Sequence, residues 1–383
     1  MPQSITPFRI EIGSAEIEDL RRRLAATRWP DRETTGDWRQ GIPLDYMQSV
    51  CDYWASGYEM QRVADRLNKF PQFRTTIDDL GIHFLHVRST HADALPLLIT
   101  HGWPGSVVEF LKVIEPLTDP VRHGGSPGDA FHVICPSLPG YGYSDKPRTS
   151  GWGVERIARA WGQLMARLGY DGYVAQGGDW GAMVTTCIGL SETVHCRGIH
   201  LNMPIVAPDM DTLNDLSELE QSALAGMQHY NDHDSGYSKQ QGTRPQTLGY
   251  GLADSPAGQA AWILEKFRAW TDCGEGTEQH PENALSRDEL LDNVMMYWLT
   301  DSAASSARLY WESFNSPNMD PVDIPVGASI FPKEIFRSSR RWAEKRFSKL
   351  IYWNELERGG HFAAFEQPGP YVQELRNCFR LLR

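Results

Sequence analysis

The chain has 383 residues, of which 41% are hydrophobic, and its 37 basic and 49 acidic side chains leave a formal net charge of −12. This composition is typical of a globular protein with a sizeable core. Because no run of Lys and Arg stands out against the acidic background, we expect no nucleic-acid partner.

The amino terminus, MPQSITPFRIEIGSAEIEDL, has no basic stretch followed by a long apolar one. No window of the chain approaches the roughly 20 apolar residues that a membrane span needs. We therefore expect no membrane anchor and a cytoplasmic location. The six cysteines show neither CxxC nor zinc-site spacing, and we expect them to be buried free thiols rather than metal ligands.

Helical spacing of apolar residues predicts helices over 14–28, with Ser14 as the N-cap, and over 43–70. The chain is thus expected to begin helical. Residues 72–80 and 81–89 then predict two strands joined by a turn at Leu80 and Gly81.

From Pro96 onward, short apolar runs alternate with helical segments, which is typical of parallel βαβ units. The expected strands are 96–101, 131–137, 172–178, 196–204, 325–331 and 349–355, and the expected helices are 105–116, 153–169 and one from 181. The long interval between the fourth and fifth of these strands is rich in helix formers and aromatic residues. We expect it to be a helical lid inserted into an α/β core.

The chain is thus expected to have an α/β fold with a mostly parallel central sheet. Four parts follow from the pattern: an amino-terminal helical meander (1–70), the first part of the core (71–205), the lid (206–318) and the second part of the core (319–383).

The stretch VAQGGDWGAMV, Val174 to Val184, has the form of a nucleophile elbow, but it carries Asp179 where a serine is usual. A carboxylate is already an anion at neutral pH and needs no base before it attacks. Attack on an ester or amide would produce a reactive anhydride, whereas attack on a saturated carbon produces an ordinary ester. The sequence therefore predicts an sp³ electrophile, such as an epoxide or an alkyl halide.

Release of that ester requires an oxyanion hole and a general base. The segment ITHGWPGS follows a predicted strand and could present the backbone N–H of Trp103, while Trp180 would present another. His361 lies between the last predicted strand and the final helix, where it could activate water.

A carboxylate must orient His361, and Glu334, just beyond a strand end, is the main candidate; Asp320, Asp323 and Glu355 are its competitors. The chain order of nucleophile, acid and histidine is that of the α/β-hydrolases.

Taken together, these motifs resemble the microsomal-type epoxide hydrolases, α/β-hydrolases that include juvenile-hormone epoxide hydrolases and soluble microbial members. The likeness covers nearly the whole chain, from TPFRIEI through HGWPGS, QGGDWGA and SGYSKQQGTRPQTLGYG to RGGHFAAFEQP. It implies that Asp179 is the nucleophile, His361 the base and Glu334 the orienting acid, with no cofactor and no metal ion.

The resemblance also implies that two lid tyrosines, Tyr237 in SGYSKQ and Tyr310 in ARLYWES, hold and protonate the epoxide oxygen. Mammalian relatives carry an amino-terminal membrane anchor, whereas this chain starts at the meander that follows it, and it is expected to be soluble. The partners it implies are a small epoxide and water, opened to a vicinal diol through an aspartyl-alkyl ester.

Two other functions stay open at this level. A haloalkane dehalogenase shares the aspartate elbow and the histidine, but it has no use for the acidic tyrosine pair. A non-catalytic binding protein of the same fold would be expected to have lost the nucleophile, acid or base. The natural substrate, which could be an aryl or vinyl epoxide of a biosynthetic pathway or a compound to be detoxified, and the oligomeric state, a homodimer among the options, are not determined.

Overall fold

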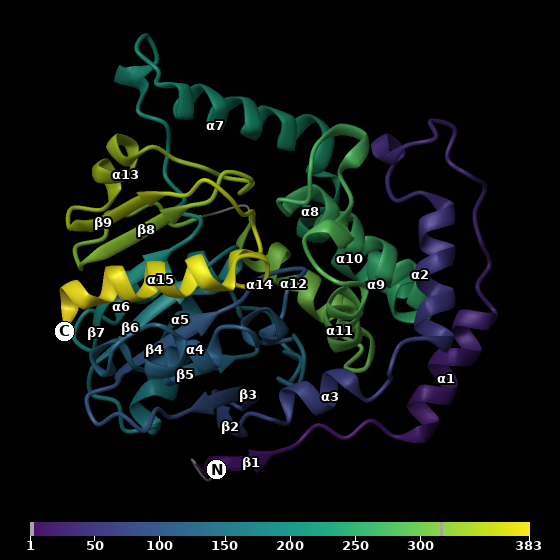
Figure 1. The fold of residues 1–383 in the computed structure, drawn as a ribbon, viewed down its shortest axis with the longest axis horizontal. Helices are drawn as coiled ribbons and strands as arrows, with labels where there is room; N and C mark the ends of the chain where they lie inside the picture. The colour runs from purple at the N-terminus through teal and green to yellow at the C-terminus, as the bar shows by residue number, and fades with distance from the viewer. Residues whose placement is uncertain (1–3, 315–316) are drawn as a thin grey trace.

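The computed structural model describes residues 4–314 and 317–383, so that the first three residues of the predicted meander and residues 315–316 of the predicted lid lie outside it. Its central feature is a nine-stranded sheet in the order β1-β2-β3-β5-β4-β6-β7-β8-β9 (Figure 1). The strands are β1 (Thr6–Phe8), β2 (Gln72–Ile77), β3 (Leu80–Val87), β4 (Leu95–Thr100), β5 (Phe131–Pro136), β6 (Tyr173–Gly177), β7 (Cys196–Leu201), β8 (Val326–Ile330) and β9 (Leu350–Glu355). In this order, β1, β2, β3 and β5 are antiparallel neighbours, and β5, β4, β6, β7, β8 and β9 are parallel neighbours. The predicted α/β class with a mostly parallel sheet is confirmed.

Strands at the centre of the sheet are apolar on both faces because helices cover both sides. The core helices are α4 (Ile114–Thr118), α5 (Val154–Arg167), α6 (Trp180–Ser191), α13 (Arg340–Arg346), α14 (Ala363–Glu366) and α15 (Pro368–Phe379). Helices α5 and α6 pack side by side, and α15 lies across the sheet in front of β6 and β7 in Figure 1.

The amino-terminal segment contains β1 and the helices α1 (Ser14–Ala25), α2 (Leu44–Ser56) and α3 (Arg62–Leu67). The prediction that the chain begins helical was wrong, because β1 pairs with β2 at the sheet edge. The predicted helix over 43–70 is broken after α2, where Gly57 ends the helix and packs so tightly that a Cβ would lie 2.6 Å from the Tyr53 ring. Gly13, not Ser14, is the N-cap of α1.

Two further local predictions were wrong. The expected helix over 105–116 is a 3₁₀ turn, Val107–Phe110, followed by the short α4. The turn between β2 and β3 is formed by Asp78 and Asp79, whose φ angles of 48° and 62° are positive, so that Leu80 already belongs to β3. Aspartate adopts a positive φ with less strain than most residues, so that this tight hairpin forms without glycine.

Between β7 and β8 the described residues form helices and loops. The helices are α7 (Glu218–His229), α8 (Gly236–Thr243), α9 (Pro245–Asp254), α10 (Pro256–Trp270), α11 (Arg287–Trp298) and α12 (Ala303–Ser313). Figure 1 shows α8 to α12 stacked between the sheet and the amino-terminal helices α1 and α2, whereas α7 runs along the top of the view above α13 and β9. Asp292 of α11 is buried and accepts hydrogen bonds from Tyr58, Arg62 and Arg66, which ties the amino-terminal segment to this helical layer.

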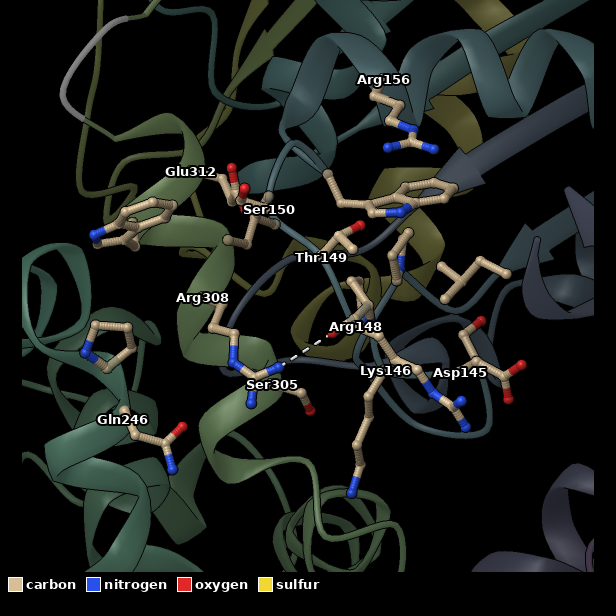
Figure 2. Close-up of a pocket in the computed structure, with 18 of the residues that line it drawn as sticks. Asp145, Lys146, Arg148, Thr149, Ser150, Arg156, Gln246, Ser305, Arg308 and Glu312 are labelled. Carbon is tan, nitrogen blue, oxygen red and sulfur yellow. Dashed lines mark hydrogen bonds between the residues drawn. The ribbon is translucent and has the colours of Figure 1, made fainter. Parts of the chain in front are cut away.

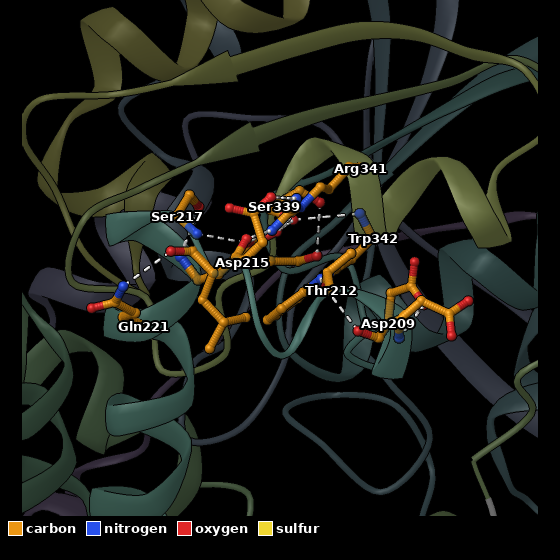
Figure 3. Close-up of polar contacts among 12 residues, drawn as sticks. Asp209, Thr212, Asp215, Ser217, Gln221, Ser339, Arg341 and Trp342 are labelled. Carbon is orange, nitrogen blue, oxygen red and sulfur yellow. Dashed lines mark hydrogen bonds and ion pairs between the residues drawn. The ribbon is translucent and has the colours of Figure 1, made fainter.

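The start of α7 is tied to α13 of the core by a second polar cluster. Glu220 accepts hydrogen bonds from the Ser339 hydroxyl and from Nε of Arg341, both at 2.6 Å, and from the Ser217 backbone at 2.8 Å. Figure 3 shows Ser217, Ser339 and Arg341 converging from the two segments. This cluster fixes where the chain leaves the core to enter the helical layer.

All six cysteines are buried and unpaired, as expected. None of the described helices combines the length and the apolar surface that crossing a lipid bilayer demands.

Candidate active site

Asp179 lies between β6 and α6 in a strained turn, with φ 49° and ψ −129°. The glycines on either side are required by close backbone packing. A Cβ at Gly177 would lie 2.0 Å from the Gly181 carbonyl oxygen, and one at Gly181 would lie 1.9 Å from that of Thr100. The GGDWG sequence therefore folds as the predicted elbow and holds the carboxylate above the end of the sheet.

The loop after β4 meets this elbow because β4 and β6 are parallel neighbours, with Thr100 opposite Gly177. The Trp103 backbone N–H donates to Oδ1 of Asp179 at 2.7 Å, as an oxyanion donor would. A Cβ at Gly102 would lie 2.1 Å from the same oxygen, so that only glycine leaves room for it. Trp180 follows Asp179, but no hydrogen bond joins its amide to the carboxylate in the described part of the chain.

His361 lies between Asp179 and Glu334. Its Nε2 lies 3.4 Å from Oδ2 of Asp179, and its Nδ1 lies 2.6 Å from Oε1 of Glu334. Glu334 is buried, and the same oxygen also accepts from the Ile335 backbone at 2.7 Å. The His361 backbone N–H donates to the Trp270 carbonyl, which holds the residue against α10.

Two of the competing carboxylates bond other groups than His361. Asp323 accepts from the Ser348 hydroxyl and Glu355 from the Trp353 indole. Asp320 is exposed, and its backbone carbonyl accepts from Arg346. Glu334 is thus the carboxylate that the fold brings to His361.

The charges around His361 set its protonation state. Burial alone lowers the pKa of an imidazole, but the charge of Glu334 and the contact with Asp179 outweigh it here, and the pKa of His361 is raised well above its ordinary value. The resting site is therefore an imidazolium between two carboxylates.

Tyr237 and Tyr310 come from α8 and α12 and lie over the elbow, both buried. The Tyr237 ring stacks on Trp103 with centroids 4.9 Å apart, and the Tyr310 ring meets it edge-on at 5.7 Å. Burial raises the pKa of both phenols well above the ordinary value, so that they keep their protons at neutral pH. Within residues 4–314 and 317–383, the buried Tyr310 hydroxyl has no hydrogen-bond partner, whereas Tyr237 has Tyr230 at 3.1 Å.

A cavity of about 20 Å³ lies at the elbow and is lined by Asp179, His361, Gln176 and Glu109, among others. Glu109 was not singled out from the sequence. The signal for it is a single carboxylate inside the apolar run SVVEFLKVI, which indicates a buried charge. Among the described residues, no cluster of three or more His, Cys, Asp or Glu side chains is arranged to hold a metal ion.

A much larger cavity, of about 1650 Å³, lies elsewhere and is lined by neither Asp179 nor His361. Figure 2 shows Lys146, Arg148 and Arg308 around it, from the loop before α5 and from α12. It contacts the face of α12 that carries Ser305, Arg308 and Glu312, whereas helical periodicity puts Tyr310 on another face. Asp179, His361 and Glu334 thus meet in the buried site at the elbow and not in this groove.

Comparisons with known proteins agree with this geometry. The family profile "Epoxide hydrolase N terminus" matches residues 5–110, and the α/β hydrolase fold profile matches residues 96–246. A Stigmatella aurantiaca protein provisionally named an epoxide hydrolase is 59% identical over 99% of this chain and 86% of its own length. Epoxide hydrolase 1 of Sus scrofa is 36% identical over 99% of this chain and 89% of its own. The crystal structure of the juvenile hormone epoxide hydrolase of Bombyx mori has a TM-score of 0.91 at 32% identity and covers 100% of this chain and 95% of that one.

Proposed function

Because the chain belongs to the epoxide hydrolase family of the α/β-hydrolase fold, we propose that it opens an epoxide to a vicinal diol in two steps, with Asp179 as nucleophile. The observation that carries the proposal is the position of the Asp179 carboxylate between the Trp103 amide, His361 and the two tyrosines. A dehalogenase would gain nothing from two protonated phenols at this position.

In the first step, Oδ2 of Asp179 attacks an epoxide carbon and the carbon–oxygen bond of the ring breaks. Oδ1 stays on the Trp103 amide and becomes the carbonyl oxygen of the ester. Tyr237 and Tyr310 donate to the ring oxygen and one of them gives it a proton. What supports this role is the buried Tyr310 hydroxyl, since a polar group without a partner in the described chain gains a hydrogen bond when the epoxide oxygen arrives.

In the second step, His361 removes a proton from water, which attacks the ester. The imidazolium of the resting state must first lose its proton. Alkylation of Asp179 removes one of the charges that raise the pKa of His361, and the tyrosinate left by the first step is an acceptor. The first step thus prepares the base for the second, while Glu334 keeps the ring oriented.

The remaining parts of the proposal concern the surroundings of the site. We propose that residues 1–70 form a meander that braces the lid (206–318) over a core of 71–205 and 319–383. The rings of Trp103, Tyr237 and Trp270 around the elbow favour an aryl or vinyl substituent on the epoxide. A homodimer and a cytoplasmic location, testable by light scattering and cell fractionation, are also proposals.

The experiment that tests the mechanism uses styrene oxide and the variant His361→Gln. A carboxylate needs no base to attack, but its ester needs an activated water, so the variant is expected to open the epoxide once and stop. Intact-protein mass spectrometry should show an increase equal to the substrate, located at Asp179 by peptide mapping. Wild-type enzyme in ¹⁸O-water should release an unlabelled diol in a single turnover. A labelled first diol without any trapped adduct would show that His361 directs water straight onto the epoxide.

A further inference from the structure

The cavity beside Asp179 belongs to the core and not to the lid. None of the described residues between 206 and 318 lines it, and its walls come from the β4 and β6 ends, the Glu109 turn and the start of α15. A site needs about 10–15 Å³ and two to four polar partners to hold one water molecule. With about 20 Å³, this cavity has room for one.

The walls of the cavity offer those partners. The Tyr371 hydroxyl donates to Oε1 of Gln176 at 2.5 Å, and Nε2 of Gln176 donates to Oδ1 of Asn202 at 3.0 Å. The three side chains thus form a chain of hydrogen bonds in the lining of the cavity. Asp179 and His361 line the same cavity, so that a water here is next to the two groups that hydrolysis requires.

Glu109 also lines the cavity, and neither of the two steps described above uses it. It is 8% exposed and reaches the cavity through the space that glycine leaves at position 105, where a Cβ would lie 1.6 Å from its Oε1. Burial raises the pKa of Glu109 to about 8, although the charge of His361 acts in the opposite direction. The side chain therefore keeps its proton at neutral pH and remains a hydrogen-bonding group without charge.

We propose that this cavity holds the water that hydrolyses the Asp179 ester and that Glu109 orients it, an inference that rests on the proposed function. The water donates one hydrogen bond to Nε2 of neutral His361 and a second to the carbonyl oxygen of Glu109. These two hydrogen bonds turn a lone pair of the water oxygen toward the ester carbon. An O–H bond of the water breaks as the new C–O bond forms, and the proton passes to His361. The tetrahedral adduct expels the diol oxygen, which takes the proton of the added hydroxyl group. Asp179 returns as a carboxylate beside the imidazolium.

A neutral Glu109 suits this role better than a charged one. Its carbonyl oxygen accepts the water hydrogen without adding a negative charge beside the oxyanion that forms on Asp179. Glutamine keeps such a carbonyl oxygen, whereas leucine has a similar size and no acceptor.

The test compares Glu109→Gln and Glu109→Leu in single turnovers with styrene oxide, following ester formation and ester loss separately by quenched-flow mass spectrometry. Ester formation at the wild-type rate shows that each variant is folded. Ester loss should slow by about 10²-fold in Glu109→Leu, as expected for a misplaced reactant, and by less than about threefold in Glu109→Gln, where the acceptor is kept. The covalent ester should therefore accumulate only in the leucine variant.

A second variant perturbs the same contact without changing Glu109. In Gly105→Ala, the new Cβ pushes the carboxyl group out of its position. Ester loss should slow as in Glu109→Leu, and the same change should cause no further loss in a Glu109→Ala background.

Two results would overturn the inference: equal loss in the glutamine and leucine variants, which would make Glu109 a charged base, or unchanged ester loss in the leucine and Gly105→Ala variants. If His361→Gln traps an adduct while the Glu109 variants hydrolyse normally, the inference fails and the proposed function stands. If His361→Gln traps nothing, the proposed function itself fails.

Discussion

The two sides of Asp179 differ in their chemistry. The side toward α8 and α12, called the lid side below, is aromatic, with the Tyr237 and Tyr310 rings 4.9 and 5.9 Å from that of Trp103, and its polar groups are phenol hydroxyls. The cavity on the side toward the core has a carboxyl group and two amides in its lining, those of Glu109, Gln176 and Asn202, beside the rings of Phe110 and Phe362. A neutral epoxide with an apolar substituent suits the first side, and a water molecule suits the second.

This difference explains how the Asp179 carboxylate can take part in ester formation and then in ester hydrolysis. Substrate and water reach Asp179 from different directions and need not displace each other. His361 lies at the border, with Nε2 facing Asp179 and its main chain held by Trp270 of α10. Changes on the lid side should therefore alter ester formation, and changes on the core side should alter ester loss.

The largest effect is expected where the two sides meet. Asp179→Asn keeps the shape of the side chain but replaces the nucleophile by an amide, and turnover should fall by on the order of 10⁴-fold or more. The measurement is diol formation by freshly purified protein, because slow deamidation to aspartate restores activity with time. Full activity in the first minutes would remove Asp179 from the nucleophile role, and circular dichroism checks that the variant is folded.

The lid side is tested by removing one hydroxyl at a time. Tyr237→Phe and Tyr310→Phe should each slow ester formation by about 10²-fold, the usual contribution of a general acid, and leave ester loss unchanged. The double variant should be almost inactive on epoxides. Tyr230→Phe is the matched control, because Tyr230 contacts the Tyr237 hydroxyl at 3.1 Å but not the elbow, and a much smaller effect is expected. Unchanged ester formation in both single variants would mean that other groups activate the ring.

Local sequence signals were sufficient for the elbow side of the site. GGDWG and HGWPG owe their shapes to glycines within a few residues. The order along the chain pointed to His361 but left Glu334 as one of four candidate carboxylates. The tyrosines could be found only through resemblance, since nothing in the composition distinguishes Tyr237 or Tyr310 from the other 12 of the 14 tyrosines. Their position depends on how α8 and α12 pack over the core, which is a tertiary effect.

Tertiary contacts also explain what was missed. The pairing of β1 with β2 joins segments more than 60 residues apart, and a three-residue strand has no periodicity to detect. Glu109 reaches the site only because the parallel register of β4 and β6 brings its turn beside Asp179. The break at Gly57 was visible as a residue type, but helical spacing of apolar positions on both sides obscured it.

The smallest effect is expected at the start of α7, in the cluster of Glu220 with Ser339 and Arg341. The hydrogen bond from Arg341 is the main cause that lowers the pKa of Glu220 to about 2, so the carboxylate form stabilises the fold. Since the folded pKa lies below the unfolded one, this stabilisation is present above about pH 4–5 and is lost as the pH falls toward 2.

At pH 7, Glu220→Gln should lower the free energy of unfolding by about 1–2 kcal/mol, as a hydrogen-bonded charge with a half-exposed partner suggests. Glu344→Gln is the matched control, because the Arg340–Glu344 pair on the same helix is exposed on both sides and should contribute less than about 0.5 kcal/mol. Urea unfolding at pH 7 and pH 3 measures both, and the difference between Glu220→Gln and wild type should shrink at the lower pH. Because the cluster joins α7 to α13 and does not line the cavity beside Asp179, ester formation should slow in Glu220→Gln while ester loss does not. Slower ester loss with unchanged ester formation would show that the two sides of Asp179 are coupled through the start of α7.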